Sequence, residues 1–447
     1  MTPAAAEIDA YVSAFAVAGV DRSTPEPAWL HALRRKSMTR FEALGLPTGR
    51  EESWRQTPVA PVVATPFRPA RPGAAFAADR LPGGPSLPFR STTRLVFVDG
   101  GFESALSAVP PPDSGFFAGS LASALREIPS AMEPLLGRIG NAETRPFVAL
   151  NAAFFADAAV VRIPAGLSLD EPVHVVHVAA RRGEAEMTCL RTLVVAEPGS
   201  RATVVESFLS ADGRPGLTNA VAEVEIAEGA SIDHVRFQSE GATDLHLGTL
   251  DARLGRDGRF ASHAISIGAR WARVEIGVTL AGTGAECFLN GMYVADGARH
   301  VDHRTSVDHA VPHGASHQLY KGLLGGASRA VFHGRILVRE DAQKTDAFQS
   351  NKNLLLSGDA LVFTRPQLEI HANDVKCTHG ATIGRLDPEA LFYLRSRGVG
   401  VEEARGVLIR AFTGEVLQRI PAAEVREGIE VEVASRVPVE SDWGGIA

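Results

Sequence analysis

The central part of the chain consists of short apolar runs that alternate with turn-forming pairs. From about residue 158 to residue 382, the strand-like runs read VVRI, VHVVHV, TLVVAE, TVVESF, VAEVEI, ARVEIGVTL, AVFHGRILV, NLLL, LVFT and LEI. The pairs between them are Gly199-Ser200, Gly229-Ala230, Gly314-Ala315, Gly326-Ala327, Asp341-Ala342, Asp359-Ala360 and Asp374-Val375. The last four pairs follow one another at steps of about 15–18 residues.

This pattern predicts a mainly β architecture. No long helical pattern lies between the runs, which argues against a sheet built from βαβ units. A short, irregular repeat of strand and turn is typical of a solenoid, in which each coil buries its apolar face against its neighbours. We therefore predict a parallel β-helix, and a β-sandwich is the alternative, because strands at short spacing also build sandwiches.

Helical patterns flank this central part on both sides. Apolar residues at Trp29, Leu30, Leu33, Phe41 and Leu44 lie on one helical face. Residues 61–90 are rich in Pro, Ala and Gly and are predicted to form a loop or linker. After Asp387, apolar residues return at helical spacing. We predict an N-terminal, mostly helical domain over residues 1–145, a β-helix core over residues 146–384 and a C-terminal helical domain over residues 385–447.

Composition narrows the class of protein. The chain has 447 residues and a net charge of -7, so a nucleic-acid-binding surface is not indicated. Its first residues lack the basic start and apolar core of a signal peptide, and no apolar stretch approaches the roughly 20 residues that cross a bilayer. The three cysteines are far apart and form no C-x-x-C pair, which fits a reducing compartment. We expect a cytoplasmic protein that does not contact the membrane.

The stretch over residues 366–398 carries the strongest candidate chemistry. Cys377 and His379 are two residues apart, so a strand would place both side chains on one face. A thiolate and an imidazole together can ligate a soft or borderline metal. Most Cys-x-His pairs, however, are a packed cysteine beside a polar histidine without a bound metal. This pair also supplies only two ligands, so a complete metal site would need others. Directly afterwards, Asp387-Pro388-Glu389 has the signature of a helix N-terminus.

Other candidate residues have ordinary structural explanations. Six histidines gather in one region: His300, His303, His309, His313, His317 and His333. Their spacing matches no known metal motif, so we expect them on outer faces and turns of the β-structure. Cys189 and Cys287 lie in apolar, strand-like settings and are predicted to be buried structural thiols. Asn351 and Asn353 are expected to form hydrogen-bonded ladders along the solenoid.

Several segments resemble the SufB/SufD family of iron–sulfur cluster assembly proteins. The resemblance is carried by PQLEI at residues 366–370, DVKCTHGAT at residues 374–382 and FYLRSRG at residues 392–398. The Cys-x-His form resembles the SufD branch more than the SufB branch. Weaker matches in the N-terminal part are GLPT at residues 45–48 with Trp54 and Thr57, and LN and AF within residues 150–154. The match is strong from about Asp302 onward, where it also includes Asp302, Arg304, His309, Pro312 and SHQLYK at residues 316–321.

The resemblance implies a fold and a role. The fold is a right-handed parallel β-helix between helical domains. The role is that of a non-catalytic SufD-like subunit of the SufBCD scaffold, which pairs with SufB and docks the SufC ATPase through its C-terminal helices. Cys377 and His379 would help to hold a transient iron–sulfur cluster shared with SufB, and His309 is an additional candidate. The resemblance also allows reduced FAD in the complex and a homodimer when the chain is isolated.

Missing motifs limit the alternatives. The chain has no G-x-x-x-x-G-K-[ST], no G-x-G-x-x-G that opens a helix after a strand, no G-x-S-x-G and no ferredoxin-type cysteine motif. Any ATP hydrolysis is therefore expected from a partner. A SufB-type paralogue is the nearest alternative, although the cluster-bearing cysteine elements of that branch are not evident. A β-helical enzyme acting on polysaccharide is a second alternative, and it would need paired carboxylates in a groove.

Overall fold

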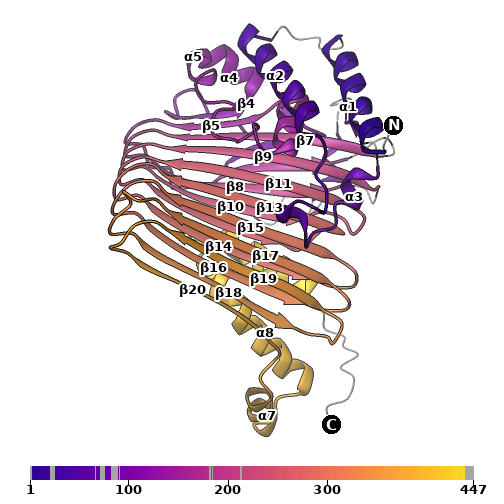
Figure 1. The fold of residues 1–447 in the computed structure, drawn as a ribbon, viewed down its shortest axis with the longest axis vertical. Coiled ribbons are helices and arrows are strands. Elements are labelled where there is room, and N and C mark those ends of the chain that lie inside the picture. Colours follow the sequence, from indigo (N-terminus) through magenta and orange to yellow (C-terminus); the bar gives the residue numbers. More distant parts are fainter. Residues whose placement is uncertain are drawn as a thin grey trace.

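A computed structural model describes residues 3–20, 26–65, 67–70, 76–81, 89, 91–180, 183, 185–211 and 214–437. Its centre is a β-solenoid in which the chain alternates between two facing sheets, and helices flank the solenoid at both ends (Figure 1). The prediction of a mainly β, solenoid architecture is thus confirmed, and the β-sandwich alternative is wrong because neighbouring solenoid strands pair in parallel.

The two sheets take alternate strands of the chain. Sheet A has the order β19 (Leu361–Ile370), β17 (Arg329–Val338), β15 (His300–His309), β13 (Trp271–Leu280), β11 (Leu245–Leu254), β9 (Gly216–Ile226), β7 (Glu186–Ala196), β5 (Ala159–Ile163) and β4 (Phe117–Ser120), and β1 (Arg68–Pro69) also pairs with β7. Sheet B has the order β20 (Lys376–Gly384), β18 (Asp346–Leu355), β16 (Ala315–Leu324), β14 (Glu286–Ala295), β12 (Arg259–Ser266), β10 (Ser231–Ser239), β8 (Arg201–Ser210), β6 (Val173–Ala179), β2 (Thr93–Val98) and β3 (Gly101–Phe102). Strands β2 to β4 lie within residues 1–145, so the sheets begin earlier than residue 146.

The helices either precede β5 or follow β20 in the chain. The N-terminal ones are α1 (Pro3–Val20), α2 (Ala28–Leu44), α3 (Ala60–Val63), α4 (Leu121–Glu127), α5 (Pro129–Met132) and α6 (Pro146–Phe154), with short 3-10 helices at Glu52–Trp54, Ala78–Arg80 and Ser104–Leu106. The C-terminal ones are α7 (Pro388–Ser396), α8 (Val401–Leu417) and α9 (Ala423–Arg436). The predicted N-terminus of α7 is confirmed, because the Asp387 side chain accepts a hydrogen bond from the Glu389 N–H. The predicted linker over residues 61–90 lies partly outside the described residues.

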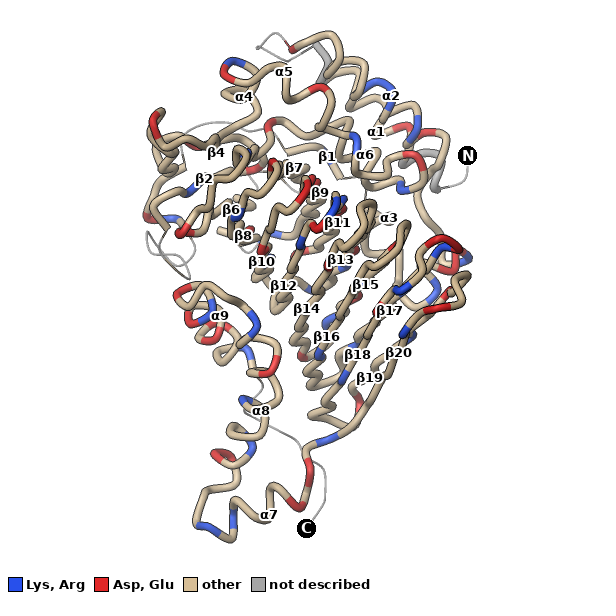
Figure 2. Tube along the Cα trace, turned by 90° about the vertical axis from the view of Figure 1, so that its left-hand side faces the viewer, with Lys and Arg blue, Asp and Glu red and all other residues tan. Residues whose placement is uncertain are grey.

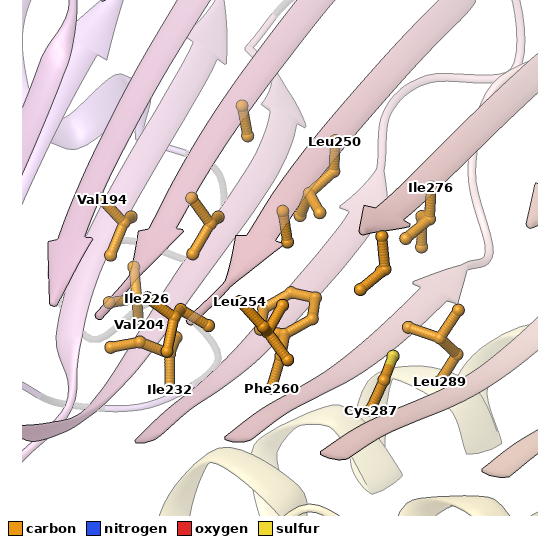
Figure 3. Close-up of a cluster of buried hydrophobic side chains, with 14 of the residues drawn as sticks. Val194, Val204, Ile226, Ile232, Leu250, Leu254, Phe260, Ile276, Cys287 and Leu289 are labelled. Atoms are coloured by element: carbon orange, nitrogen blue, oxygen red, sulfur yellow. The ribbon is translucent and has the colours of Figure 1, made fainter. Parts of the chain in front are cut away.

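Alternate side chains of each strand point into the space between the sheets. Figure 3 shows part of this interior, where Val204 and Ile232 of sheet B meet Ile226 and Leu254 of sheet A. Burying each such side chain contributes roughly 1.5–3 kcal/mol. Cys287 lies in the same cluster, as predicted for a structural thiol. Stacked coils also bring their turns into close contact. A Cβ on Gly326, whose φ is +55°, would lie 2.7 Å from the backbone nitrogen of Gly297, so this turn requires glycine.

The helices cover different outer faces of the two sheets. Residues of α8 and α9, including Ile409 and Ile429, pack with outward side chains of sheet B such as Met292 and Leu319. The N-terminal helices cover the outer face of sheet A at the opposite end of the solenoid, where Cys189 is buried as predicted. Helix α7 has no buried residue and projects beyond the last coils (Figures 1 and 2).

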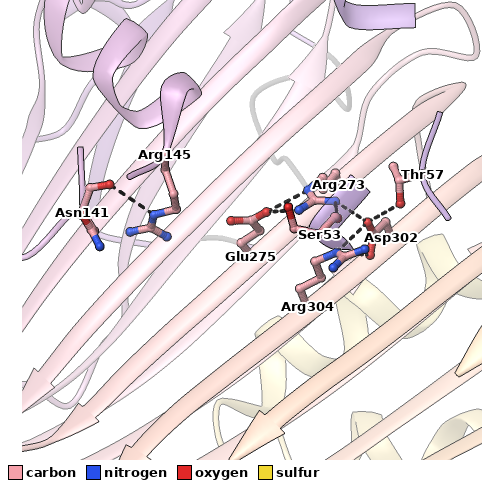
Figure 4. Close-up of polar contacts among 8 residues, drawn as sticks. All are labelled: Ser53, Thr57, Asn141, Arg145, Arg273, Glu275, Asp302 and Arg304. Carbon is pink, nitrogen blue, oxygen red and sulfur yellow. Dashed lines mark hydrogen bonds and ion pairs between the residues drawn. The ribbon is translucent and has the colours of Figure 1, made fainter. Parts of the chain in front are cut away.

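A buried ionic cluster fixes residues 53–57 to the outer face of sheet A (Figure 4). The Arg273 guanidinium donates to the Ser53 carbonyl and to Asp302 Oδ2, both at 2.8 Å. Thr57 Oγ1 donates to the same carboxylate at 2.5 Å, and Arg304 Nε does so at 2.9 Å. Burial raises the pKa of Asp302, but the two arginines and the hydroxyl outweigh it and hold that pKa below its usual value.

Candidate functional site

Cys377 and His379 lie on β20, the strand that ends sheet B. In the parallel pairing with β18, Cys377 is opposite Ala347 and His379 is opposite Gln349. Ala347 and Gln349 are both buried between the sheets, and side chains at matched positions of parallel strands point the same way. Both candidate side chains therefore lie on one face, as their spacing predicts, and the structure shows that this is the interior side at the open end of the solenoid.

The two side chains differ in exposure and in their surroundings. Cys377 is half-buried and packs against the interior apolar cluster, whereas His379 is exposed. Burial raises the pKa of the Cys377 thiol, the Asp346 carboxylate raises it further, and a hydrogen bond from the Ala347 backbone only partly opposes this. The thiol is therefore protonated at neutral pH. It becomes a thiolate, the form that binds metal or attacks sulfur, only when a cation or a metal supplies compensating charge.

The last coil of the solenoid has an apolar rim. Leu361, Phe363 and Ile370 on β19 and Ile383 on β20 are exposed, although each is large and hydrophobic. Strands β19 and β20 also end their sheets, so each presents one row of backbone N–H and C=O groups that no neighbouring strand of its sheet uses. An apolar rim beside two strand edges is a surface suited to another β-structure.

The histidine cluster is distributed over several different environments. His303 and His309 point into the interior and are buried, so the prediction that the cluster occupies outer faces and turns is wrong for these two residues. The reason is that strand alternation defines two faces but does not say which one is inside. His300 is on the outer face but is buried against Trp271, and His313 occupies a turn. His317 and His333 are half-buried and point outward.

His309 has a structural partner in the interior. Its Nε2 lies 2.8 Å from Ser316 Oγ, and burial lowers its pKa to about 4, so the ring is neutral. His309 is on β15, two sheet-A strands before β19, and the pairing places Val338 and then Ile370 at the same position of the following strands. The structure therefore does not bring His309 next to Cys377 and His379. Its functional role stays a prediction.

The interior also contains hydrogen-bonded polar groups, and one of them, Glu206, was not a candidate in the sequence. Glu206 lies between His234 Nε2, at 2.9 Å, and His177 Nε2, at 3.5 Å. Burial raises the pKa of Glu206, but hydrogen bonds from both imidazoles hold it well below its usual value. Nearer the open end, Asn351 donates to Tyr293 Oη and to the Tyr320 carbonyl. The predicted asparagine contacts therefore exist, and they connect neighbouring coils.

A hollow lies on the outer face of sheet A. This groove of about 1050 Å³ runs between residues 52–56 and residues 139–145. Its carboxylates are paired with arginines: Asp251 with Arg145, Glu275 with Arg273, Glu369 with Arg335 and Glu52 with Arg365. Within the part of the chain that the structure describes, no three His, Cys, Asp or Glu side chains gather as a metal-binding group.

Comparison with known protein families decides the relationship. The family described as "SUF system FeS cluster assembly, SufBD core domain" matches residues 177–412, and the one described as "SufBD protein N-terminal region" matches residues 8–175. The chain belongs to the SufBD family. The resemblance noted in the sequence is thereby confirmed.

Relatives within the SufBD family are similar over most of the chain. An "Iron-sulfur cluster assembly SufBD family protein" of Synechocystis is 31% identical over 404 residues, which cover 88% of each chain. The "Iron-sulfur cluster assembly protein SufD" of Escherichia coli is 30% identical and covers 88% of this chain and 90% of its own. SufD of Bacillus subtilis is 26% identical and covers 72% of this chain and 73% of its own. Among the helices of the described residues, none has the length and apolar character needed to span a membrane.

Proposed function

We propose that this SufBD family protein is a SufD-like, non-catalytic subunit of a SufBCD scaffold for iron–sulfur cluster assembly. The observation that carries the proposal is the position of Cys377 and His379 on the terminal strand β20, within an apolar rim at the open end of the solenoid. The names of the relatives favour the SufD branch over a SufB-type paralogue and favour assembly over polysaccharide chemistry.

The chemistry of the pair suits iron and sulfide as cargo. Thiolate sulfur and imidazole nitrogen are both established ligands of iron–sulfur clusters. This chain offers two such groups at the open end, so the proposal assigns the remaining ligands to the SufB-type partner. Because the Cys377 thiol is protonated in the isolated chain, cluster binding would release its proton. Binding of a reduced flavin by the complex, and a cytoplasmic location, stay predictions of the family resemblance.

The open end is proposed as the surface that pairs with SufB, or with a second copy of this chain when SufB is absent. A strand edge gains backbone hydrogen bonds when another strand is added, and exposed apolar side chains gain burial at the same time. Both features occur together along β19 and β20.

Changing Ile383 to Asp tests this surface. Ile383 is 51% exposed, so the chain itself should unfold at an unchanged urea concentration. A carboxylate buried without a partner in the interface should lower the affinity for SufB, and self-association, at least about tenfold. Co-purification and analytical ultracentrifugation measure both effects. Val431→Asp, at an exposed position of α9, is the matched control, and equal loss of pairing in both variants would contradict the assignment.

The C-terminal helices are proposed to dock the SufC ATPase. Helix α7 buries none of its residues, and its Phe392 and Tyr393 are 73% and 58% exposed. Exposed aromatic side chains are common anchors of protein interfaces. Helix α8 connects this surface to sheet B, because Lys321 of β16 donates to the Phe412 carbonyl at 2.7 Å and pairs with Glu415.

Changing Phe392 and Tyr393 together to Ala should remove SufC from the complex while SufB stays bound. Loss of two aromatic anchors is expected to weaken capture by about tenfold or more. Pull-down of tagged chain from cells that co-express the SufB-type and SufC-type partners measures it, with Val431→Ala as the control. If SufC still binds with unchanged affinity, its docking site is elsewhere.

The whole proposal is tested by the same co-expression. The purified complex is reconstituted anaerobically with ferrous iron and sulfide, and iron, sulfide and visible absorption are measured. A complex that gains a cluster supports the scaffold role. If the chain binds neither partner under these conditions, the proposal is wrong, whatever the state of Cys377 and His379.

A further inference from the structure

A row of three matched positions leads from the interior to His379. Gln318 on β16 is paired with Gln349 on β18, and Gln349 is paired with His379 on β20. Both glutamines are buried between the sheets, at 1% and 0% exposure. Because matched positions of parallel strands direct their side chains alike, His379 is the last member of this row and the only exposed one.

Hydrogen bonds fix the orientation of the two glutamines. Thr305 Oγ1 donates to Gln318 Oε1 at 2.7 Å, and Gln349 Nε2 donates to the same oxygen at 3.0 Å. That oxygen has two lone pairs, so both are used. The amide nitrogen of Gln349 is directed to the preceding coil, so the amide oxygen of Gln349 is directed away from that coil. Gln349 Oε1 is buried and accepts no hydrogen bond from the residues that the structure describes.

Gln318 Nε2 is also buried without a partner among the described residues, but it belongs to the amide whose oxygen already accepts from Gln349 Nε2. Few other donors surround Gln349 Oε1. The Gln349 amide reaches across the interior to Gly334 of β17, where a Cβ would lie 2.1 Å from Nε2, so only glycine leaves it room. The matched position on β19 is Pro366, which has no backbone N–H. On the last coil, the donors that face the interior are the His379 imidazole, the Cys377 thiol and the Thr364 hydroxyl. Thr364 Oγ1 is also buried, and it has no hydrogen-bond partner within the described part of the chain.

We propose that Gln349 is a positioning residue for His379. When one ring nitrogen of His379 binds the iron of the nascent cluster, the N–H of the other ring nitrogen is donated to Gln349 Oε1. A neutral imidazole has one N–H and one lone pair, so this hydrogen bond selects which nitrogen is free for iron. It also orients an otherwise exposed ring. The inference rests on the proposed ligand role of His379 and adds the buried row of Thr305, Gln318 and Gln349 behind it.

The test uses the reconstituted complex of the full chain with its SufB-type and SufC-type partners, loaded with ferrous iron and sulfide. Gln349→Met keeps the length of the side chain and removes the acceptor, and it is expected to weaken iron retention against a chelator by about 10–100-fold. Gln349→Glu restores an oxygen acceptor but not the donor to Gln318 Oε1, so it should recover part of that loss. Thr364→Val, which removes the other unpartnered group of this coil, should leave retention unchanged.

A double-mutant cycle separates positioning from general damage. In a His379→Ala background, Gln349→Met should cause no further loss of iron, because its effect passes through the ring. A second measurement labels only the histidines of this chain with ¹⁵N and records the ¹⁵N hyperfine coupling of the reduced cluster. His379→Ala should abolish the coupling, whereas Gln349→Met should change its size. If Gln349→Met does not fold, Gln349→Leu replaces it in these measurements. Leucine also lacks the acceptor oxygen but fills the space with a different shape.

The outcomes are distinct. Iron retention by Gln349→Met equal to the wild type, or an equal loss in the presence and absence of His379, overturns the positioning role alone. An unchanged coupling and retention in His379→Ala overturns the ligand role, and the positioning role with it.

Discussion

Replacing Cys377 and His379 together by alanine will leave the chain folded but reduce the iron and sulfide held by its complex at least about tenfold. The fold should tolerate the change because His379 is exposed and Cys377 is only half-buried on a terminal strand. Substitutions at such positions usually change the free energy of unfolding by about 0.5 kcal/mol or less. The cluster should not tolerate it, because the change removes both of the ligands that we assign to this chain.

The matched control for this variant lies on the same strand. Lys376 and Thr378 are exposed, flank Cys377 on β20 and point to the opposite face. Lys376→Ala with Thr378→Ala should retain partner binding and cluster content. Circular dichroism and urea unfolding check the fold of both double variants, and co-purification checks the complex. Undiminished iron and sulfide in the Cys377→Ala, His379→Ala complex would contradict the site while leaving the scaffold role in place.

Changing Asp302 to Ala is expected to lower the free energy of unfolding by about 3–5 kcal/mol. The substitution removes the carboxylate that pairs with Arg304 and leaves Arg273, which is 2% exposed, with Glu275 as its remaining carboxylate partner. It also removes the acceptor of Thr57. Residues 53–57 would lose their attachment to sheet A at the same time. Urea unfolding at pH 7, followed by circular dichroism, measures the change.

The sign of the pH dependence follows from the lowered pKa of Asp302. A carboxyl whose pKa is lower in the folded state stabilises the fold above its unfolded pKa of about 3.9, and this contribution disappears as the pH falls through the folded value. The deficit of Asp302→Ala relative to the wild type should therefore be constant near neutrality and shrink in acid. Glu228→Ala, which removes the partner of Arg256 in an exposed pair, is the control and should unfold like the wild type. Equal behaviour of the two variants would mean that the Asp302 cluster does not stabilise the fold.

The pattern of the sequence was sufficient for the architecture and for the position of the candidate pair. The apolar runs and turn pairs between residues 158 and 382 predicted a solenoid, and the spacing of Cys377 and His379 placed both on one face. These features are local, because strand alternation and turn chemistry depend on neighbouring residues. The N-terminus of α7 at Asp387 is local in the same sense.

Which side of each strand lies inside was decided only by the tertiary structure. Strand alternation places His303 and His309 on the face opposite to that of their sequence neighbours, but it does not say that this face is the interior. In the structure both residues are buried there. Helices and N-terminal segments also cover much of the outer faces of the sheets. A charged side chain that points outward is therefore not necessarily exposed to solvent. Arg191 and Arg273 point outward from sheet A and are each only 2% exposed.

Contacts between distant residues were likewise invisible in the sequence. Thr57 reaches Asp302 across 245 residues, and the row of Gln318, Gln349 and His379 exists only because three coils pair at the same position. A glutamine in a strand has no distinctive local signal, and its role depends on what the next coil places beside it. The sequence by itself determined the repeating strands and the thiol–imidazole pair. The stacking of the coils decided what lies behind that pair, because strand register is set by packing over the whole solenoid.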